Sequence, residues 1–223
     1  AESTPGPVAI NSATYIGYWD PMACYTYSTA NGYFVRDSAA TKVGTSIQCN
    51  NKWSGNLPNW VASSAIDMHR YAMTGGERIE DSETKTVLQR AVLQTDFYRN
   101  GSYFPAKRLN GNLSKFTPLV VNTGLPDNGD VYFSSCLAKI FVGSDSGGSC
   151  ATPGNSQRFG PSGTAGSYNA KVEVCTATEG PLRPDLCLRY PNGNYKPIGS
   201  IQTYAEQLRF AAFGYLMDNT VSR

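Results

Sequence analysis

Six cysteine residues constrain the fold of this chain more than any other feature of its sequence. No two of them form a Cys-x-x-Cys pair, and the single histidine, His69, adjoins none of them. Zinc sites usually take ligands in closely spaced pairs and often add histidine, so a zinc site is not expected. An even number of widely spaced cysteines favours three disulfides in an exported protein. The alternative is six reduced, buried thiols in a cytosolic protein.

The spacing of the cysteines does not determine how they pair, because six cysteines allow fifteen pairings. Pairing each cysteine with its neighbour is the simplest arrangement and closes three short loops. The pairs expected on this basis are Cys24–Cys49, Cys136–Cys150 and Cys175–Cys187.

Composition and charge exclude two classes of partner. Charged residues make up 16% of the chain, the net charge is +2, and no run of four basic residues occurs. Binding to nucleic acid needs clustered Lys and Arg, so that partner class is not expected. No apolar segment approaches the roughly 18–20 residues that cross a bilayer, so membrane insertion is not expected. The abundance of Tyr and Gly is typical of exported, loop-rich proteins.

The pattern along the chain predicts an α+β fold, with an antiparallel or mixed sheet, two main helices and disulfide-closed loops. Residues 1–13 are rich in Pro, Ser and Ala and are expected to form a flexible lead, followed by a single domain over 14–223. One helix is predicted over 58–74, where a proline opens it and two glycines end it. A second is predicted over 82–93, with apolar residues on one face.

The rest of the chain is expected to contain mainly strands and loops. The residue types of 115–121, 130–142 and 168–175 predict strands. The turn formers of 143–167 predict a long loop. A short helix over 200–207 and an apolar strand over 208–216 are expected to follow.

Ser63, Asp67 and His69 on the first predicted helix raise the question of a hydrolase triad. At about 100° per residue, Asp67 and His69 lie roughly 160° apart, so the carboxylate cannot orient the imidazole. Asp67 is expected to pair with Arg70 in a narrow polar stripe. A lone histidine on an apolar helix face is more often packed and bonded to a carbonyl than catalytic, and we expect this of His69.

Two acidic motifs resemble parts of metal sites, PDNGD at 126–130 and DSGGS at 145–149. The first lacks the alternating ligands and distal glutamate of an EF-hand loop. The second lacks one hydroxyl ligand of the metal motif of von Willebrand A domains, because Gly147 replaces a serine. Turn formation explains both, and we expect no metal and no cofactor.

Three blocks of sequence resemble the N-terminal region of the type IV pilus tip-associated adhesins of the neisserial PilC type. They are YIGYWDPMACYTY at 15–27, the segment from WSGNLPNW to TVLQRA at 53–91, and the segment from KVEVC to FGYLMDN at 171–219. Pro58 departs from the pattern, since relatives usually carry an apolar residue there. The chain between about 94 and 170 has no match.

The resemblance implies a function without catalysis. Such proteins are exported through the periplasm and lie at the pilus tip on the bacterial surface, where they support pilus assembly and attach the fibre to surfaces or host cells. It implies minor pilins or the rest of the tip complex as partners, together with a surface or host receptor such as a glycan. It also allows a second architecture, a degraded von Willebrand A-like α/β sheet with large insertions that includes 58–74 and 208–216.

The contact surface is expected in the aromatic, loop-rich middle of the chain, around Tyr98, Tyr103, Phe104 and 143–167. Such loops provide amphipathic contact area at low entropic cost. Two other functions remain open. One is a secreted carbohydrate-binding module, and the other is a secreted hydrolase that uses His69 with a distant nucleophile.

Overall fold

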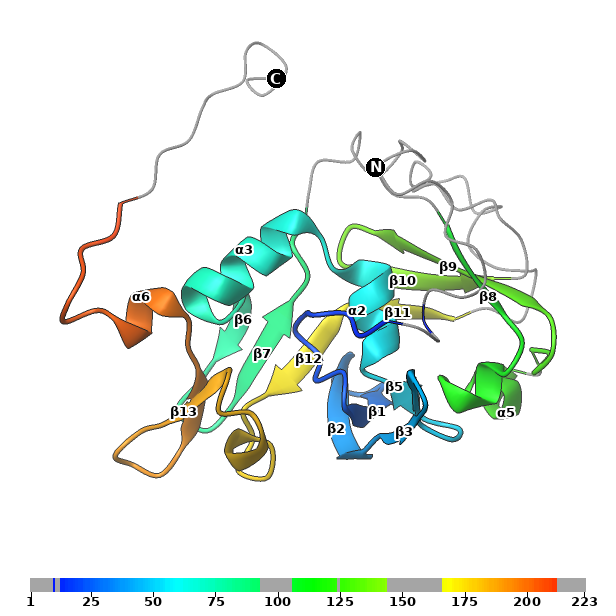
Figure 1. Ribbon diagram of the computed structural model, residues 1–223, viewed down its shortest axis with the longest axis horizontal. Helices are drawn as coiled ribbons and strands as arrows, with labels where there is room; N and C mark the ends of the chain where they lie inside the picture. Colours follow the sequence, from blue (N-terminus) through cyan, green and yellow to red (C-terminus); the bar gives the residue numbers. More distant parts are fainter. Residues whose placement is uncertain (1–9, 11–12, 93–105, 124, 144–165, 212–223) are drawn as a thin grey trace, which may run out of the picture.

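Two sheets carry most of the core in the described part of the chain. The computed structural model describes residues 10, 13–92, 106–123, 125–143 and 166–211, and all statements on the fold refer to these ranges (Figure 1). The first sheet has six strands in the order β5-β1-β2-β12-β7-β6. In that order, their bounds are Trp53–Ser54, Ala23–Ser28, Tyr33–Ala39, Lys171–Val174, Thr86–Gln89 and Arg78–Asp81.

The six-stranded sheet is mixed because one strand enters it from late in the sequence. Strand β12 runs parallel to β2, with Val172 opposite Phe34, and antiparallel to β7 on its other side. The other pairings in this sheet are antiparallel. This confirms the α+β class with a mixed sheet. The described strands do not form the mainly parallel sheet of the von Willebrand A-like alternative.

The second sheet has four strands in the order β11-β10-β9-β8, and its pairs are antiparallel. Their bounds in that order are Ser167–Asn169, Lys139–Gly143, Asp130–Cys136 and Lys107–Asn110. The segment predicted as a strand over 130–142 forms the β9–β10 hairpin. The strand predicted over 168–175 is divided at Ala170, so that β11 belongs to the second sheet and β12 to the first.

Two small hairpins and several short helices surround these sheets. The hairpins are β3 (Thr41–Val43) with β4 (Ser46–Gln48), and β13 (Cys187–Arg189) with β14 (Tyr195–Pro197). The α-helices are α2 (Asn56–Ala62), α3 (Ala65–Thr74), α5 (Leu119–Thr123) and α6 (Ser200–Thr203), and the 3₁₀ turns are η1 (Leu113–Lys115) and η3 (Gly180–Leu182).

The single helix predicted over 58–74 is two helices, α2 and α3. Ser63 has extended backbone angles, which end α2. The Ser64 side chain then accepts a hydrogen bond from the backbone N–H of Asp67, and the Asp67 carboxylate accepts one from the N–H of Ser64. This capping box starts a new helix. Gly75, in the left-handed conformation, ends α3 as predicted.

The helix predicted over 82–93 is wrong, because its centre is strand β7. Thr86, Val87 and Leu88 are all buried, and β7 is hydrogen-bonded between β12 and β6. A strand buried on both faces has consecutive apolar residues, which a helical pattern can also contain. Sequence periodicity therefore could not separate the two.

Two further predicted elements differ from the structure. The strand predicted over 115–121 is replaced by η1 and α5, and the Thr117 hydroxyl accepts a hydrogen bond from the N–H of Leu119 at 3.3 Å. The predicted helix over 200–207 is shortened to α6. Residues 208–211 form no regular element, and the remainder of the strand predicted over 208–216 lies outside the described residues.

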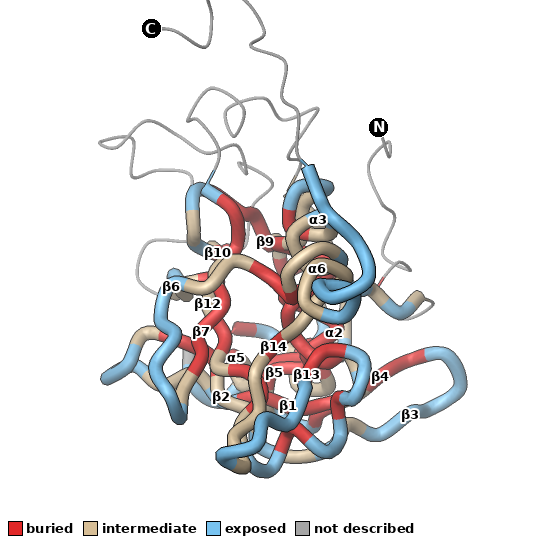
Figure 2. The backbone as a smooth tube through the Cα atoms, turned by 90° about the vertical axis from the view of Figure 1, so that its left-hand side faces the viewer, coloured by how far each residue is buried: buried red, intermediate tan, exposed pale blue. Residues whose placement is uncertain are grey.

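Aromatic side chains join the two sheets. Trp53 on β5 contacts Phe34 on β2 at 5.4 Å between ring centroids, and Tyr168 on β11 at 4.7 Å. All these contacts have tilted or edge-on geometry, which favours the ring quadrupoles. Figure 2 shows buried backbone in the inner strands, and helix α2 is also buried throughout, whereas the β3 strand is exposed.

Two disulfides have both partners within the described residues, Cys24–Cys49 and Cys175–Cys187, as neighbour pairing predicts. Cys136 is also disulfide-bonded, and its predicted partner Cys150 lies outside the described residues. None of the described helices has both the length and the apolar character needed to cross a membrane.

Candidate functional site

Helix α2 holds the segment of residues 13–19 through two buried asparagines. The Asn56 amide accepts a hydrogen bond from the N–H of Tyr15 and donates one to the carbonyl of Ala13. Asn59 accepts from the N–H of Trp19 and donates to the carbonyls of Tyr15 and Trp19. Because a segment beside a helix has no strand to pair with, these side chains satisfy its backbone instead.

Two glycines allow this close approach. A Cβ atom on Gly17 would lie 2.1 Å from Oδ1 of Asn59, and one on Gly55 would lie 2.0 Å from the carbonyl oxygen of Asp20. No side chain fits at either position without moving the backbone. The YIGYWD and WSGN motifs are therefore the two sides of one contact.

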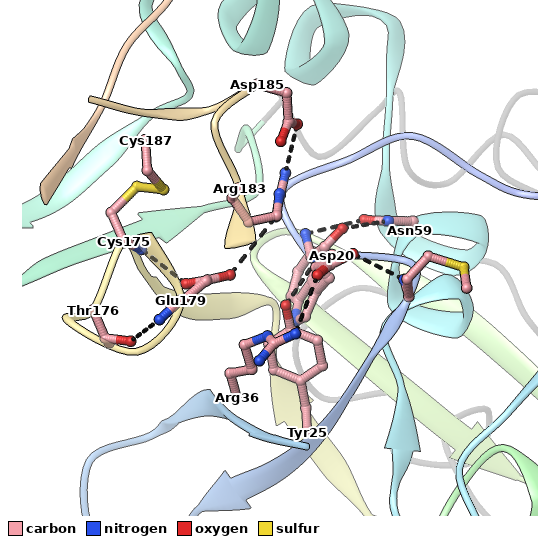
Figure 3. Close-up of polar contacts among 12 residues, drawn as sticks. Asp20, Tyr25, Arg36, Asn59, Cys175, Thr176, Glu179, Arg183, Asp185 and Cys187 are labelled. Atoms are coloured by element: carbon pink, nitrogen blue, oxygen red, sulfur yellow. Dashed lines mark hydrogen bonds and ion pairs between the residues drawn. A yellow bond between two sulfur atoms is a disulfide. The ribbon is translucent and has the colours of Figure 1, made fainter. Parts of the chain in front are cut away.

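Asp20 and Tyr25 extend these buried polar contacts (Figure 3). The group formed by Asn59, Asp20, Tyr25 and Arg36 is called the polar centre below. The buried Tyr25 hydroxyl accepts a hydrogen bond from the N–H of Asp20, while Oδ1 of Asp20 accepts one from the N–H of Met22. The other carboxylate oxygen lies 3.5 Å from Nη2 of Arg36 on β2. Burial, followed by the nearby Glu179 carboxylate, raises the pKa of Tyr25, so its phenol stays neutral.

The loop closed by Cys175–Cys187, hereafter the 175–187 loop, brings two charged residues to this centre. Glu179 is 0% exposed and Arg183 is 4% exposed. The Glu179 carboxylate accepts a hydrogen bond from the N–H of Cys175 at 2.8 Å, and its other oxygen lies 3.7 Å from Nη1 of Arg183 (Figure 3). Burial raises the pKa of Glu179 to about 7, and the opposing effects of Arg183 and of the Cys175 N–H do not cancel it.

Arg183 also connects the loop to helix α3. Its Nη2 donates to the Tyr71 hydroxyl at 2.9 Å, and the same nitrogen lies 3.4 Å from Oδ2 of Asp185. Tyr71 in turn donates to Asp185 at 2.9 Å. The polar centre thus joins the N-terminal segment, the sheet, α2, α3 and the 175–187 loop.

The predicted roles of Asp67 and His69 are corrected by the structure. Asp67 is 1% exposed and accepts hydrogen bonds from Ser64 and from the N–H of Ala91, whereas Arg70 pairs with Glu77. His69 is exposed rather than packed. The helical wheel separated the carboxylate from the imidazole correctly, but the polar face of α3 is the one that points inward.

These groups hold together segments that are distant in the sequence. Glu179 has a perturbed pKa, which is common at active sites, but its full burial keeps it from any substrate. Within the described ranges, no three His, Cys, Asp or Glu side chains gather as a metal site. Asp127 of the PDNGD motif accepts a hydrogen bond from the N–H of Ser114, and Asp130 accepts one from Asn110, so both support local turns and pairing.

The predicted contact residues cannot be placed relative to this centre. Tyr98, Tyr103 and Phe104 lie outside the described residues, as do 144–165 of the predicted loop and its DSGGS motif.

Sequence reasoning missed Asn56, Asn59, Glu179 and Arg183. Two asparagines three residues apart in an otherwise apolar helix were one available signal, since buried amides need partners. A Glu and an Arg four residues apart between two disulfide-bonded cysteines were another.

Comparisons with known proteins give a consistent result. A family model described as "PilY1 homolog, small alpha/beta domain" matches residues 10–164. Two proteins of Xylella fastidiosa (strain Temecula1), both named type IV pilus biogenesis factor PilY1 homolog, are each 29% identical to the chain and align with 92% and 91% of it. The chain covers only 17% and 15% of their lengths. No solved structure matches.

Proposed function

The chain belongs to the PilY1 family of type IV pilus biogenesis factors, and we propose that it is a non-enzymatic domain that supports pilus assembly and attaches the pilus tip to surfaces. It is exported through the periplasm and displayed outside the cell. Its partners are the minor pilins or the rest of the tip complex, and a surface or host receptor such as a glycan.

The match of the family model over 10–164 carries this proposal, and two structural features support it. Disulfides form and persist in oxidising compartments, which fits an exported protein. Side-chain contacts such as those of Asn59 and Arg183 fasten segments that are distant in the sequence, which suits a protein under tension.

The test replaces the predicted contact residues in the full-length protein of a piliated bacterium. The triple variant Tyr98→Ser, Tyr103→Ser, Phe104→Ser is compared with the control His69→Ala, whose side chain is exposed on α3. We expect the triple variant to keep normal pilus numbers and tip labelling by immunogold but to lose attachment to surfaces, whereas the control keeps both.

Loss of pili in the triple variant would assign these residues to assembly instead of attachment. Unchanged attachment would contradict the proposed contact surface. Absence of the protein from pili in labelled cells would overturn the tip location. A glycan that raises the melting temperature of the isolated protein would identify the receptor class.

A further inference from the structure

The buried carboxylate of Glu179 has few neighbouring groups that could stabilise its negative charge. Only one of its oxygens, Oε2, accepts a hydrogen bond, from the N–H of Cys175. The other, Oε1, has no hydrogen-bond partner among the described residues, and its 3.7 Å separation from Nη1 of Arg183 is too long for one. An ionised carboxylate with a single hydrogen bond and no solvent is costly.

Arg183 does not neutralise Glu179 fully, because it is shared. Its Nη2 is directed to the Tyr71 hydroxyl and the half-exposed Asp185 carboxylate, while Nη1 has no hydrogen bond within the described chain. The geometry therefore pairs Arg183 more closely with Asp185 than with Glu179.

The other charged and titratable groups that face Glu179 nearly balance one another. Arg36 on β2 favours its ionised form and Asp20 opposes it, and these two residues already pair with each other at 3.5 Å. Tyr25 on β1 is neutral, as described above. The cations that lower the pKa of Glu179 are thus Arg183 and Arg36, and each of them also pairs with an aspartate.

We propose that the 175–187 loop is a pH-sensitive latch: Glu179 is protonated while the loop is docked on the polar centre, and it ionises when the loop loosens. The loop therefore docks most firmly in mild acid and opens more readily as the pH rises through neutrality. The Cys175–Cys187 disulfide keeps the loop closed on itself in both states.

The direction follows from proton linkage. The pKa of Glu179 is about 7 in the docked state and 4.5 for an ordinary glutamate. Between these values the docked state binds one more proton than the open state, so raising the pH favours opening, by up to tenfold per pH unit. The stabilisation of the docked loop by protonation of Glu179 is complete below about pH 4.5 and is lost above about pH 7.

Hydrogen exchange of the intact, disulfide-bonded chain tests the latch. Protection factors of the amides in 175–187 are measured at pH 6 and pH 8 and corrected for the intrinsic pH dependence of exchange. In the wild type, we expect the protection factors at pH 8 to be about tenfold lower than at pH 6. In Glu179→Gln, which can still accept from the Cys175 N–H, they should not change. Glu83→Gln, at an exposed glutamate bonded to Asn192, is the matched control and should behave as wild type.

A direct titration covers the case in which Glu179→Gln does not fold. The side-chain carboxyl carbon of Glu179 is followed by NMR in the folded wild type, and we expect a midpoint close to pH 7. A midpoint at the ordinary value for glutamate, or equal protection at both pH values, would overturn the proposal.

Discussion

At the scale of single residues, Asp67 links two segments that are distant in the sequence. Its Oδ2 accepts hydrogen bonds from the backbone and hydroxyl of Ser64, while Oδ1 accepts one from the N–H of Ala91 after β7. Asp67 and Ala91 are both buried, so removing the carboxylate would take a buried acceptor away from the Ala91 N–H.

Replacing this carboxylate is therefore expected to destabilise the domain. Asp67→Ala removes the carboxylate half of the α3 capping box and the acceptor that Asp67 offers to the Ala91 N–H, which should lower the free energy of unfolding by about 2–4 kcal/mol. His69→Ala, two residues away but exposed, should change it by no more than about 0.5 kcal/mol. Denaturant unfolding of both variants measures the difference, and equal effects would contradict the inward orientation of Asp67.

At the scale of elements, the two described disulfides each close a local loop. Cys24–Cys49 encloses β1 to β4, with a sequence separation of 25, and Cys175–Cys187 encloses η3, with a separation of 12. A closed loop cannot extend when the chain is pulled from its ends.

Pulling single molecules with and without reductant measures these loops. Reduction should lengthen the fully unfolded chain by about 11–12 nm for the two described disulfides, at 3.3–3.6 Å per residue. A further increase of roughly 4–5 nm is expected if Cys136 pairs with Cys150, on the same scale. When Cys175 and Cys187 are both replaced by serine, the increase in length on reduction should be about 3–4 nm smaller. No change with reductant would contradict the disulfides.

Elements also show where prediction from the pattern fails. Strand structure over 130–142 was predicted, because its residue types are a local signal, but the turn that divides it into the β9–β10 hairpin was not. Strand β7 was predicted as part of a helix, although Thr86–Leu88 pairs with β12. That partner lies more than eighty residues later in the sequence, and no local pattern reports it.

At the scale of the whole molecule, the domain extends beyond the region that the family model matches. That match ends at residue 164, yet β12 at Lys171–Val174 lies between β2 and β7 in the six-stranded sheet. Val172 and Val174 are buried in the core, and the 175–187 loop covers the polar centre.

A chain that stops at residue 164 is therefore expected not to fold cooperatively. Its sheet would have unpaired edges at β2 and β7 and would lack part of its core. The truncation removes both Cys175 and Cys187, so it leaves no unpaired thiol from that disulfide that could affect folding. Circular dichroism and thermal unfolding compare it with a chain that stops at residue 211, which should unfold in one cooperative transition. Cooperative unfolding of the shorter chain would place the domain boundary near residue 164.

The sequence by itself determined the fold class, the family and the ends of its clearest local elements. Turn formers and cap residues act over a few residues, and the three blocks that resemble the pilus-tip family are specific when they are taken together in their order. Only the tertiary structure decided which face of α3 is buried, that residues 86–89 form a strand, and that Glu179 and Arg183 lie beside Asp20 and Arg36. The physical reason is that burial and charge pairing depend on contacts between segments that lie from 24 to more than a hundred residues apart, which local propensity does not encode.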